Sequence, residues 1–367
     1  MFRKVDTPLL IAVLTLLIGG LVIFGSAALG VLAVNEVKFY SVIKTQFIYA
    51  LIGGSLMMFL GMSIPIAFYK KYAAYLFGAA FFATCLVFVP GLSTYHGGAH
   101  RWVDIGAFSV QPSEGLKFTF VAIVALLCTQ YRSRFKEWKY GFWPYTILAM
   151  LVSALMLAQP DFGTYLVIMT ASFVVFFVGG ARKKHCITLV VAAIIAFCVL
   201  VASRPYMMER VKTFLNGSHD PRGSSWQLNQ SLIAIGTGGL TGRGLGQSVQ
   251  KFNYLPEPIG DSVFAVAAEE LGFIGAMLLI GLYAFIGLRG YTVSIRAQDQ
   301  FSRLLGVGIV TILLTQGTLN IGSMMGILPL TGLPLPLVSH GGTALMIAMF
   351  ECGVLLLISQ QHKLHQR

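Results

Sequence analysis

Long apolar runs recur from one end of the chain to the other, and they decide what the chain can fold into. A helix needs about 20 mainly apolar residues to cross the hydrocarbon core of a bilayer. Ten runs of roughly that length are predicted to span a membrane: 9–34, 45–62, 73–90, 115–131, 142–158, 164–180, 186–203, 263–288, 304–328 and 343–361. Because a helix satisfies its own backbone hydrogen bonds in lipid, we predict an all-α integral membrane protein with about ten transmembrane helices.

No stretch of the chain is predicted to form a separate soluble domain. Hydrophobic residues make up 56% of the sequence and charged residues 11%, so little polar chain remains between the apolar runs. We therefore treat residues 1–367 as one polytopic membrane domain. The first run is expected to remain as a span, since its apolar core is longer than that of a cleavable signal.

The distribution of basic residues predicts the orientation. With the N-terminus in the cytoplasm, 16 of the 26 Lys and Arg residues fall on cytoplasmic segments, whereas three of the 14 acidic residues do. An excess of Lys and Arg in short cytoplasmic loops is the usual bias. Both termini are therefore predicted to be cytoplasmic, with one long extracytoplasmic loop, about 204–262, between spans seven and eight. The net charge of +12 does not indicate nucleic-acid binding, because the basic residues are spread over several loops.

Acidic residues collect on the predicted outer side, and Asp261 is the most informative of them. It follows the polar sequence YLPEPIG and directly precedes an apolar run, so a carboxylate is placed where the long loop meets hydrocarbon. An ionisable group at that depth is a candidate functional residue. The simpler interpretation is that Asp261 caps a helix that begins at Ser262, a role that Asp performs well.

Two further outer segments carry candidate charges. In residues 96–118, Arg101 lies beside a tryptophan at the expected membrane interface, and Glu114 and Lys117 are three residues apart on one helix face. That spacing is close enough for an ion pair, which would neutralise both charges even without a functional role. Asp161 lies in a Pro-Asp-x-Gly turn, an ordinary turn sequence, but on the same side of the membrane as Glu114 and Asp261.

The stretch 326–342, between spans nine and ten, is too rich in proline and glycine to form a regular helix. Non-helical backbone at membrane depth is tolerated when it is buried in protein or lines a polar cavity. Ser339 and His340 at its end are therefore candidates for substrate contact, although residues of this kind often only make structural hydrogen bonds.

The long loop supplies positive charge but no nucleotide-binding motif. Its cations suit an anionic partner, although a solvated loop would also carry them; they are Arg210, Lys212, Arg222, Arg243 and Lys251. The glycine-rich run 236–246 lacks both the lysine of a phosphate-binding loop and a preceding strand, so nucleotide binding is not predicted. The neighbouring sequence QSLIAIGTGGL is expected to lie along the membrane surface or to re-enter it.

Five motifs in this order resemble the SEDS family, the shape, elongation, division and sporulation proteins. They are GGAHRW with QPSEGLKF, then QPDFG, QSLIAIGTGGLTGRGLGQSVQKFNYLPE, DSVFAVAAEELGFIG and NIGSMMGILPLTGLPLPLVSHGG. Within the family, the sequences GLGQSVQKFNYLPEP and RAQDQFSRLL are most like those of the cell-division members, and the spore-cortex members are similar enough to remain an alternative. Two positions depart from the family pattern. Ile259-Gly260 stand where His-Thr is usual, and His340 stands where Tyr is usual.

The resemblance implies a peptidoglycan glycosyltransferase of the bacterial cytoplasmic membrane. It would polymerise lipid II on the outer face during septal synthesis and release undecaprenyl pyrophosphate. Asp261 would act as general base on the acceptor 4-hydroxyl as that oxygen attacks the anomeric carbon of the lipid-linked donor. Arg or Lys side chains, or a divalent cation such as Mg²⁺ or Mn²⁺, would stabilise the leaving pyrophosphate. No resident metal site is predicted from the residues themselves.

The resemblance also implies the remaining contacts of the site. Glu114, Lys117 and Asp161 would shape the substrate cavity. Further substrate contacts are expected from Arg101, Arg243, Lys251, Ser339 and His340. The expected partners are a class B penicillin-binding protein with transpeptidase activity and other divisome proteins.

Two rival functions remain open from sequence. A lipid II flippase would carry acids and cations at mid-membrane and polar groups on both faces, whereas here the polar groups gather on one face. A non-catalytic scaffold for the transpeptidase is the other rival, and the departure at Ile259-Gly260 leaves room for it.

Overall fold

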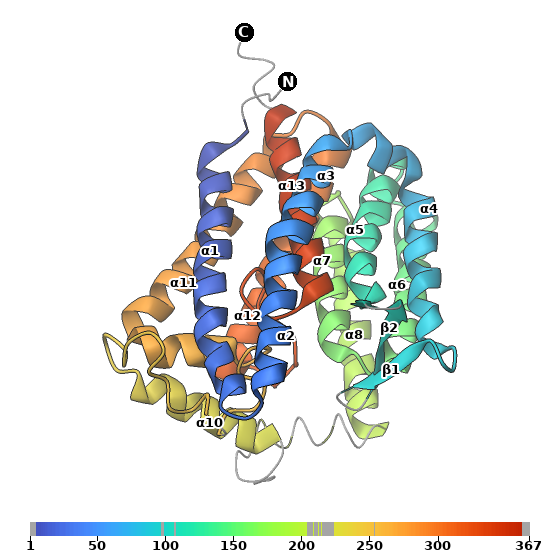
Figure 1. Ribbon diagram of the computed structural model, residues 1–367. Helices are drawn as coiled ribbons and strands as arrows, with labels where there is room; N and C mark the ends of the chain where they lie inside the picture. Colours follow the sequence, from blue (N-terminus) through green and yellow to red (C-terminus); the bar gives the residue numbers. More distant parts are fainter. Residues whose placement is uncertain are drawn as a thin grey trace.

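Apolar helices run between the two ends of the molecule (Figure 1). The computed structural model describes residues 5–96, 99–105, 108–203, 224–252 and 254–361, together with Met208, Lys212 and Phe214. Within these residues, nine helices are long and apolar enough to cross a membrane, and α7 (Phe162–Val178) is an apolar helix of 17 residues. These ten described segments match the ten predicted spans in order, which confirms the helical membrane fold class.

The spans, in chain order, begin with α1 (Thr7–Leu32) and α2 (Glu36–Phe47), which continues through a π-helical segment (Ile48–Gly54) into α3 (Ser55–Ser63). They continue with α4 (Ile66–Cys85), α5 (Pro112–Gln130), a π-helical segment (Trp138–Phe142) leading into α6 (Trp143–Ala158), α7 and α8 (Lys183–Ser203). The last three are α11 (Val263–Ile295), α12 (Gln300–Met324) and α13 (Gly342–Gln361). The second span begins well before the predicted 45, because Asn35 caps its first turn by accepting from Lys38 N at 2.9 Å.

α12 lies inside the bundle and packs against α5, α7, α11 and α13. Small residues allow the helices to approach closely, as is common in membranes. A Cβ added at Gly61 of α3 would lie 2.4 Å from Phe350 O of α13, and one at Gly353 would lie 2.2 Å from Met58 O. α8 is peripheral by contrast, with most of its side chains exposed, as expected for a helix that faces lipid.

The two ends of the bundle differ. α1 begins and α13 ends at one of them, where Asp6 N donates to Ser359 Oγ at 3.0 Å and Arg289 pairs with Asp6 at 2.8 Å (Figure 1). The opposite end carries α10 (Ser224–Thr237), a small sheet and the loop between α12 and α13. The candidate site residues gather at this second end.

A three-stranded antiparallel sheet precedes α5. Its strands are β1 (Ser93–His96), β2 (Ala99–Ile105) and β3 (Phe108–Val110), with β2 in the middle. On β2, Val103 is paired with Ser93 on one side and with Val110 on the other. The sheet was not predicted, since its short strands lie between the apolar runs from which the spans were read. It places Arg101 on β2, near the start of α7.

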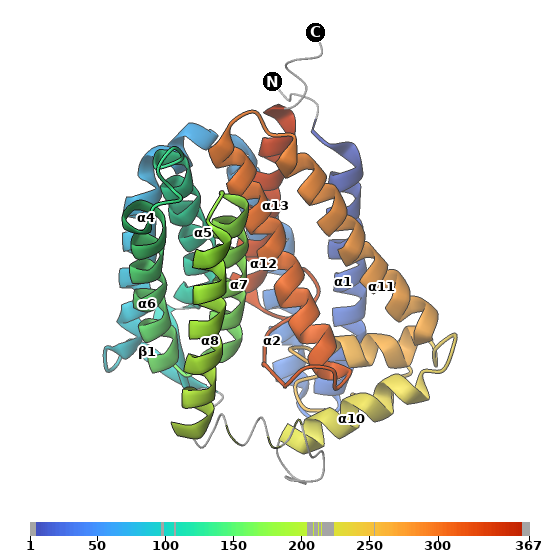
Figure 2. The same ribbon diagram turned by 180° about the vertical axis from the view of Figure 1, so that it is seen from behind.

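α10 lies across the end of the bundle (Figure 2). It packs against α11, which is one helix with a break near its start. At Gly272 the backbone has φ 68° and ψ −167°, so the first turns of α11 run in a different direction from the rest. Of the predicted loop cations, Arg210 and Arg222 lie outside the described residues, and Lys212 is exposed.

Candidate active site

Asp261 lies two residues before α11 begins, at the end that carries α10. Its Oδ2 accepts a hydrogen bond from Gln227 Nε2 of α10 at 3.0 Å, and its Oδ1 accepts from Ser262 Oγ at 3.4 Å. Burial raises the pKa of Asp261 to about 6; the hydrogen bond from Gln227 offsets part of this rise, and the charge of Glu257 adds to it. A carboxyl group with such a pKa can accept and release a proton near neutral pH, as a general base must.

The prediction that Asp261 caps the following helix is wrong. α11 begins at Val263 with Ser262 at the N-cap position, and no side chain caps its first turn. The Asp261 carboxylate is turned toward Gln227 of α10 instead. Its main-chain carbonyl is held separately, by Asn320 Nδ2 of α12 at 2.7 Å. The backbone is therefore fixed independently of the carboxylate, which is partly buried.

Ser339 and His340 hold the chain just before Asp261. Ser339 Oγ donates to Gly260 O at 2.6 Å, and His340 N donates to Ile259 O at 2.8 Å. Both contacts are made to main-chain carbonyls. The structure therefore places these two predicted residues beside Asp261, as supports for its turn.

The His340 ring points toward α1 and α2. It stacks on Phe24 with 5.7 Å between ring centroids, and its Nδ1 lies 2.9 Å from Gln46 Oε1. Burial lowers the pKa of His340, so the ring is neutral at physiological pH. A neutral imidazole here provides packing and one hydrogen bond rather than a positive charge.

Arg101 and Asp161 meet at the turn before α7. Asp161 is 3% exposed, and its Oδ1 caps α7 by accepting from Thr164 N at 3.2 Å. Its Oδ2 accepts from Gln111 Nε2 at 3.3 Å, and Arg101 Nη2 donates to Pro160 O at 2.5 Å. These contacts join the sheet, the start of α5 and the start of α7.

Glu114 and Lys117 form the predicted ion pair inside the bundle. Lys117 Nζ lies 2.7 Å from Glu114 Oε2, and both side chains are 3% exposed. Lys117 Nζ also donates to Gln316 Oε1 of α12 at 2.6 Å. A third ionisable side chain, Glu351 of α13, is buried close to both of them.

The loop between α12 and α13 connects these groups through two consecutive residues. Asn320, which holds Asp261, also donates to Leu333 O at 2.7 Å, and Gln316, which holds Lys117, donates to Pro334 O at 2.9 Å. At the start of α7, a Cβ on Gly163 would lie 2.8 Å from Leu333 Cγ. The predicted residues on α5, on α7 and before α11 are thus anchored to one segment of chain.

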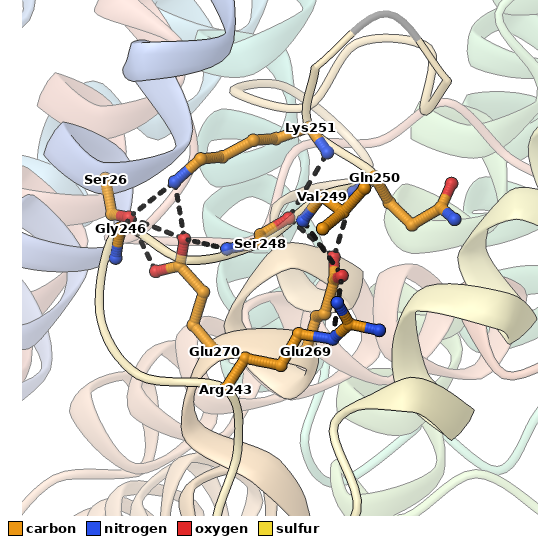
Figure 3. A network of polar contacts seen from close by, with 9 residues as sticks. All are labelled: Ser26, Arg243, Gly246, Ser248, Val249, Gln250, Lys251, Glu269 and Glu270. Atoms are coloured by element: carbon orange, nitrogen blue, oxygen red, sulfur yellow. Dashed lines mark hydrogen bonds and ion pairs between the residues drawn. The ribbon is translucent and has the colours of Figure 1, made fainter.

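Arg243 and Lys251 belong to a separate network, drawn in Figure 3. Lys251 Nζ lies 2.7 Å from Glu270 Oε1, and both side chains are almost completely buried. Arg243 Nε lies 3.5 Å from Glu269 Oε1, but its side chain is 40% exposed. Of these two predicted cations, Arg243 is the one that an anionic group can reach.

Three site residues were not recognised from the sequence. Gln227 contacts the Asp261 carboxylate, Gln46 contacts His340, and Ser26 donates to Glu270 Oε1 at 2.7 Å. Each is an uncharged polar residue in or beside an apolar stretch, a weak signal that many structural residues share. Asn320 and Gln316, two polar residues within α12, hold the loop between α12 and α13 through Leu333 O and Pro334 O.

The described residues contain no group of three or more His, Cys, Asp or Glu side chains placed to hold a metal ion. Mg²⁺ commonly binds through one or two carboxylates together with substrate phosphates, so this arrangement still permits a cation that arrives with a pyrophosphate.

Membrane helices, with a partly buried carboxylate at the end opposite the start of α1, define a multi-pass membrane protein with its candidate site at one membrane surface. A family model described as cell cycle protein, covering FtsW, RodA and SpoVE, matches residues 7–364. The chain therefore belongs to this family, the SEDS family that its motifs resemble.

Relatives and a solved structure agree with this assignment. Stage V sporulation protein E of Bacillus subtilis is 36% identical over 361 residues, 98% of each chain. A protein from a Geobacter species named "Probable peptidoglycan glycosyltransferase FtsW" is 36% identical over 321 residues, 86% of each chain. A chain from a peptidoglycan synthase complex that coordinates polymerization and crosslinking has a TM-score of 0.81 and 28% identity, covering 99% of this chain and 100% of that one.

Proposed function

We propose that this chain is a peptidoglycan glycosyltransferase that polymerises lipid II on the outer face of the bacterial cytoplasmic membrane, with both termini in the cytoplasm. The observation that carries the proposal is Asp261, a partly buried carboxylate with a pKa of about 6 at one membrane surface. The names of its relatives and the synthase complex that it resembles support the same reaction.

In the proposed reaction, Asp261 accepts the proton of the acceptor sugar's 4-hydroxyl. The oxygen of that hydroxyl forms a bond to the anomeric carbon of the second, lipid-linked sugar. The bond from that carbon to the pyrophosphate oxygen breaks, and its electrons leave with undecaprenyl pyrophosphate. The proton on Asp261 is then released to water, which restores the base.

The leaving pyrophosphate requires positive charge. Arg243 is half-exposed and could contact the pyrophosphate. Lys251 is buried in an ion pair with Glu270, so it would act by holding the loop in position rather than by contacting the substrate. A divalent cation, Mg²⁺ or Mn²⁺, would arrive with the pyrophosphate of the substrate and would neutralise the departing charge. Arg101, Glu114, Lys117, Asp161, Ser339 and His340 would line or support the sugar and lipid sites around Asp261.

We further place this activity in cell division, together with a class B penicillin-binding protein and other divisome proteins. Relatives of 34–36% identity over nearly the whole chain carry the name FtsW, and the related synthase complex couples polymerisation to crosslinking. The sporulation relative is equally similar. If the protein acted only in spore formation, the proposed cellular process would change and the proposed reaction would stay the same.

The test uses purified protein in lipid nanodiscs, with and without its penicillin-binding partner, and labelled lipid II as substrate. Asp261→Asn keeps the size of the side chain and its contact with Gln227 but cannot accept the proton. Loss of a general base typically slows a reaction by about 10²–10⁴-fold. A folded Asn variant that binds the partner but polymerises lipid II at the normal rate would reject the catalytic role and favour a scaffold or a transporter.

A further inference from the structure

The network around Glu269 and Glu270 joins three elements that lie far apart in the sequence (Figure 3). Glu269 accepts from Ser248 Oγ at 2.5 Å, from Val249 N at 3.0 Å and from Gln250 N at 3.3 Å. Hydrogen bonds to a charged acceptor are shorter and stronger than neutral ones. Glu269 therefore fixes three consecutive residues of the outer loop against α11.

Glu270 faces the other way, toward α1. It accepts from Ser26 Oγ of α1 at 2.7 Å and from Lys251 Nζ at 2.7 Å. Lys251 Nζ also donates to Ser26 Oγ at 3.2 Å, so the three side chains form a closed, buried triangle. Adjacent carboxylates on one helical turn are thus held by two different elements.

Close backbone contacts complete the attachment. A Cβ on Gly30 of α1 would lie 2.2 Å from Lys251 O, so the loop rests directly on α1 at this point. On the other side, a Cβ on Gly242 would lie 2.1 Å from Glu270 O. The loop is therefore clamped between α1 and the first turns of α11.

The clamp and Asp261 lie at opposite ends of one short helix. The first part of α11 runs from Val263 to the break at Gly272, and Glu269 and Glu270 lie near the end of this part. With a rise of about 1.5 Å per residue, the six steps from Val263, where the helix begins, to Glu269 span roughly 9 Å, and Asp261 lies two residues before that start. A helix of that length is stiff, so movement at the clamped end moves the end that carries Asp261.

We propose that Ser26, Lys251, Glu269 and Glu270 are positioning residues that set where Asp261 stands, by locking the first turns of α11 against α1 and the outer loop. The inference rests on the proposed function, since it assigns a role toward Asp261 as general base. Lys251 then contributes to catalysis without touching the substrate.

The most direct test pushes the loop at Lys251 away from α1 without removing any charged side chain. We call the contacts of Ser26, Lys251, Glu269 and Glu270 the clamp. Gly30→Ala forces Lys251 O away from α1, because the new Cβ would otherwise lie 2.2 Å from it. The matched control is Gly25→Ala on the same helix, where a Cβ meets nothing within 4 Å. Both variants change one glycine of α1 to alanine, so differences between them report the clamp.

Lipid II polymerisation would be measured in nanodiscs from pH 4.5 to 8.5, giving kcat and KM. A misplacement of about 1 Å can cost about 10²-fold in rate, so we expect kcat of Gly30→Ala to fall by at least about tenfold. KM should change little, and Gly25→Ala should resemble the parent. The acid limb of kcat should also move to lower pH, because a displaced Asp261 is better solvated.

The pH readout depends on the groups that face Asp261. Glu257 is the charged neighbour on its own turn, while Gln227 from α10, Asn320 from α12 and Ser262 are neutral. Simple loss of folded protein would lower the rate equally at every pH and leave the midpoint of the acid limb unchanged. The shift therefore separates positioning from general destabilisation.

If Gly30→Ala does not fold, the double variant Lys251→Met with Glu270→Gln removes both charges of the triangle and serves in its place. An unchanged kcat and acid limb in a folded clamp variant would overturn the inference. Failure of the proposed function looks different: Asp261→Asn would then polymerise normally. If Asp261→Asn is inactive but the clamp variants behave like the parent, the proposed function stands and only the positioning role is rejected.

Discussion

The buried pair of Glu114 and Lys117 gives a sharp energetic prediction. Lys117→Met keeps the length of the side chain and removes its charge, leaving Glu114 with 3% exposure and no cation at 2.7 Å. Breaking a buried pair by removing one partner typically costs about 3–5 kcal/mol, because the remaining charge is uncompensated. Lys117 also faces buried Glu351 and donates to Gln316, so we expect a loss of stability within that range.

The chain offers a matched control. Arg134 and Glu137 form an ion pair with the same i,i+3 spacing at 2.9 Å, but their side chains are 54% and 47% exposed. Exposed pairs contribute about 0.2–1 kcal/mol, so Arg134→Met should change stability by no more than that. The free energy of unfolding would be measured by titrating detergent-solubilised protein with SDS and following circular dichroism.

A second variant separates stability from function. Glu114→Leu with Lys117→Met removes both charges, and replacing a whole buried pair by hydrophobic residues of similar volume is often neutral or stabilising by about 1–4 kcal/mol. The double variant should therefore recover most of the stability lost in Lys117→Met. If it folds but does not polymerise lipid II, the pair shapes the substrate site; normal polymerisation limits the pair to structural support. A cost for Lys117→Met as small as that for Arg134→Met would refute the reasoning from burial.

Three further outcomes follow from the turn around Asp261. The polymerisation rate should fall below about pH 6 as the base becomes protonated, which a pH–rate profile measures and which Asp261→Asn should abolish. Because the folded-state pKa lies above the ordinary value of 3.8, the folded protein binds more protons between about pH 4 and 6, and the stability contributed by this group falls as pH rises through that window. Asp261→Asn should therefore be at least as stable as the parent at pH 7 in the same SDS titration. Gly260→Thr should fold and retain its polymerisation rate within about threefold, because a Cβ there would meet Glu257 only at ordinary contact distances of 3.5 and 3.6 Å.

The membrane fold was largely predictable because lipid imposes its constraint on local sequence. Each span must be apolar for about 20 residues and helical throughout, so the ten runs could be read one at a time. The pairing of Glu114 with Lys117 was predictable for the same reason, since helical periodicity alone brings residues three apart together. The break in α11 was not predicted, because Gly272 resembles the many other glycines in the spans.

The assembly of the site could not be predicted in the same way. Lys251 and Glu270 are 19 residues apart, and Ser26 is 244 residues from Glu270, so their contact depends on how three elements pack. Leu333 and Pro334 anchor the site through main-chain carbonyls, which every residue carries and no side-chain motif reveals. The sequence therefore indicated which charges lie toward the same end of the bundle but not which of them are already paired.

The same main-chain chemistry explains why the two departures from the family pattern leave Asp261 in place. Ile259 and Gly260 stand where His and Thr are usual, and His340 stands where Tyr is usual, yet the departures meet in space. His340 N donates to Ile259 O, and Ser339 Oγ donates to Gly260 O, so the turn is held through carbonyls that do not depend on the side chains at 259 and 260. The carboxylate of Asp261 is held from α10 and its carbonyl from α12, neither of which uses the changed positions. The placement of the proposed base is therefore independent of the side chains at 259 and 260.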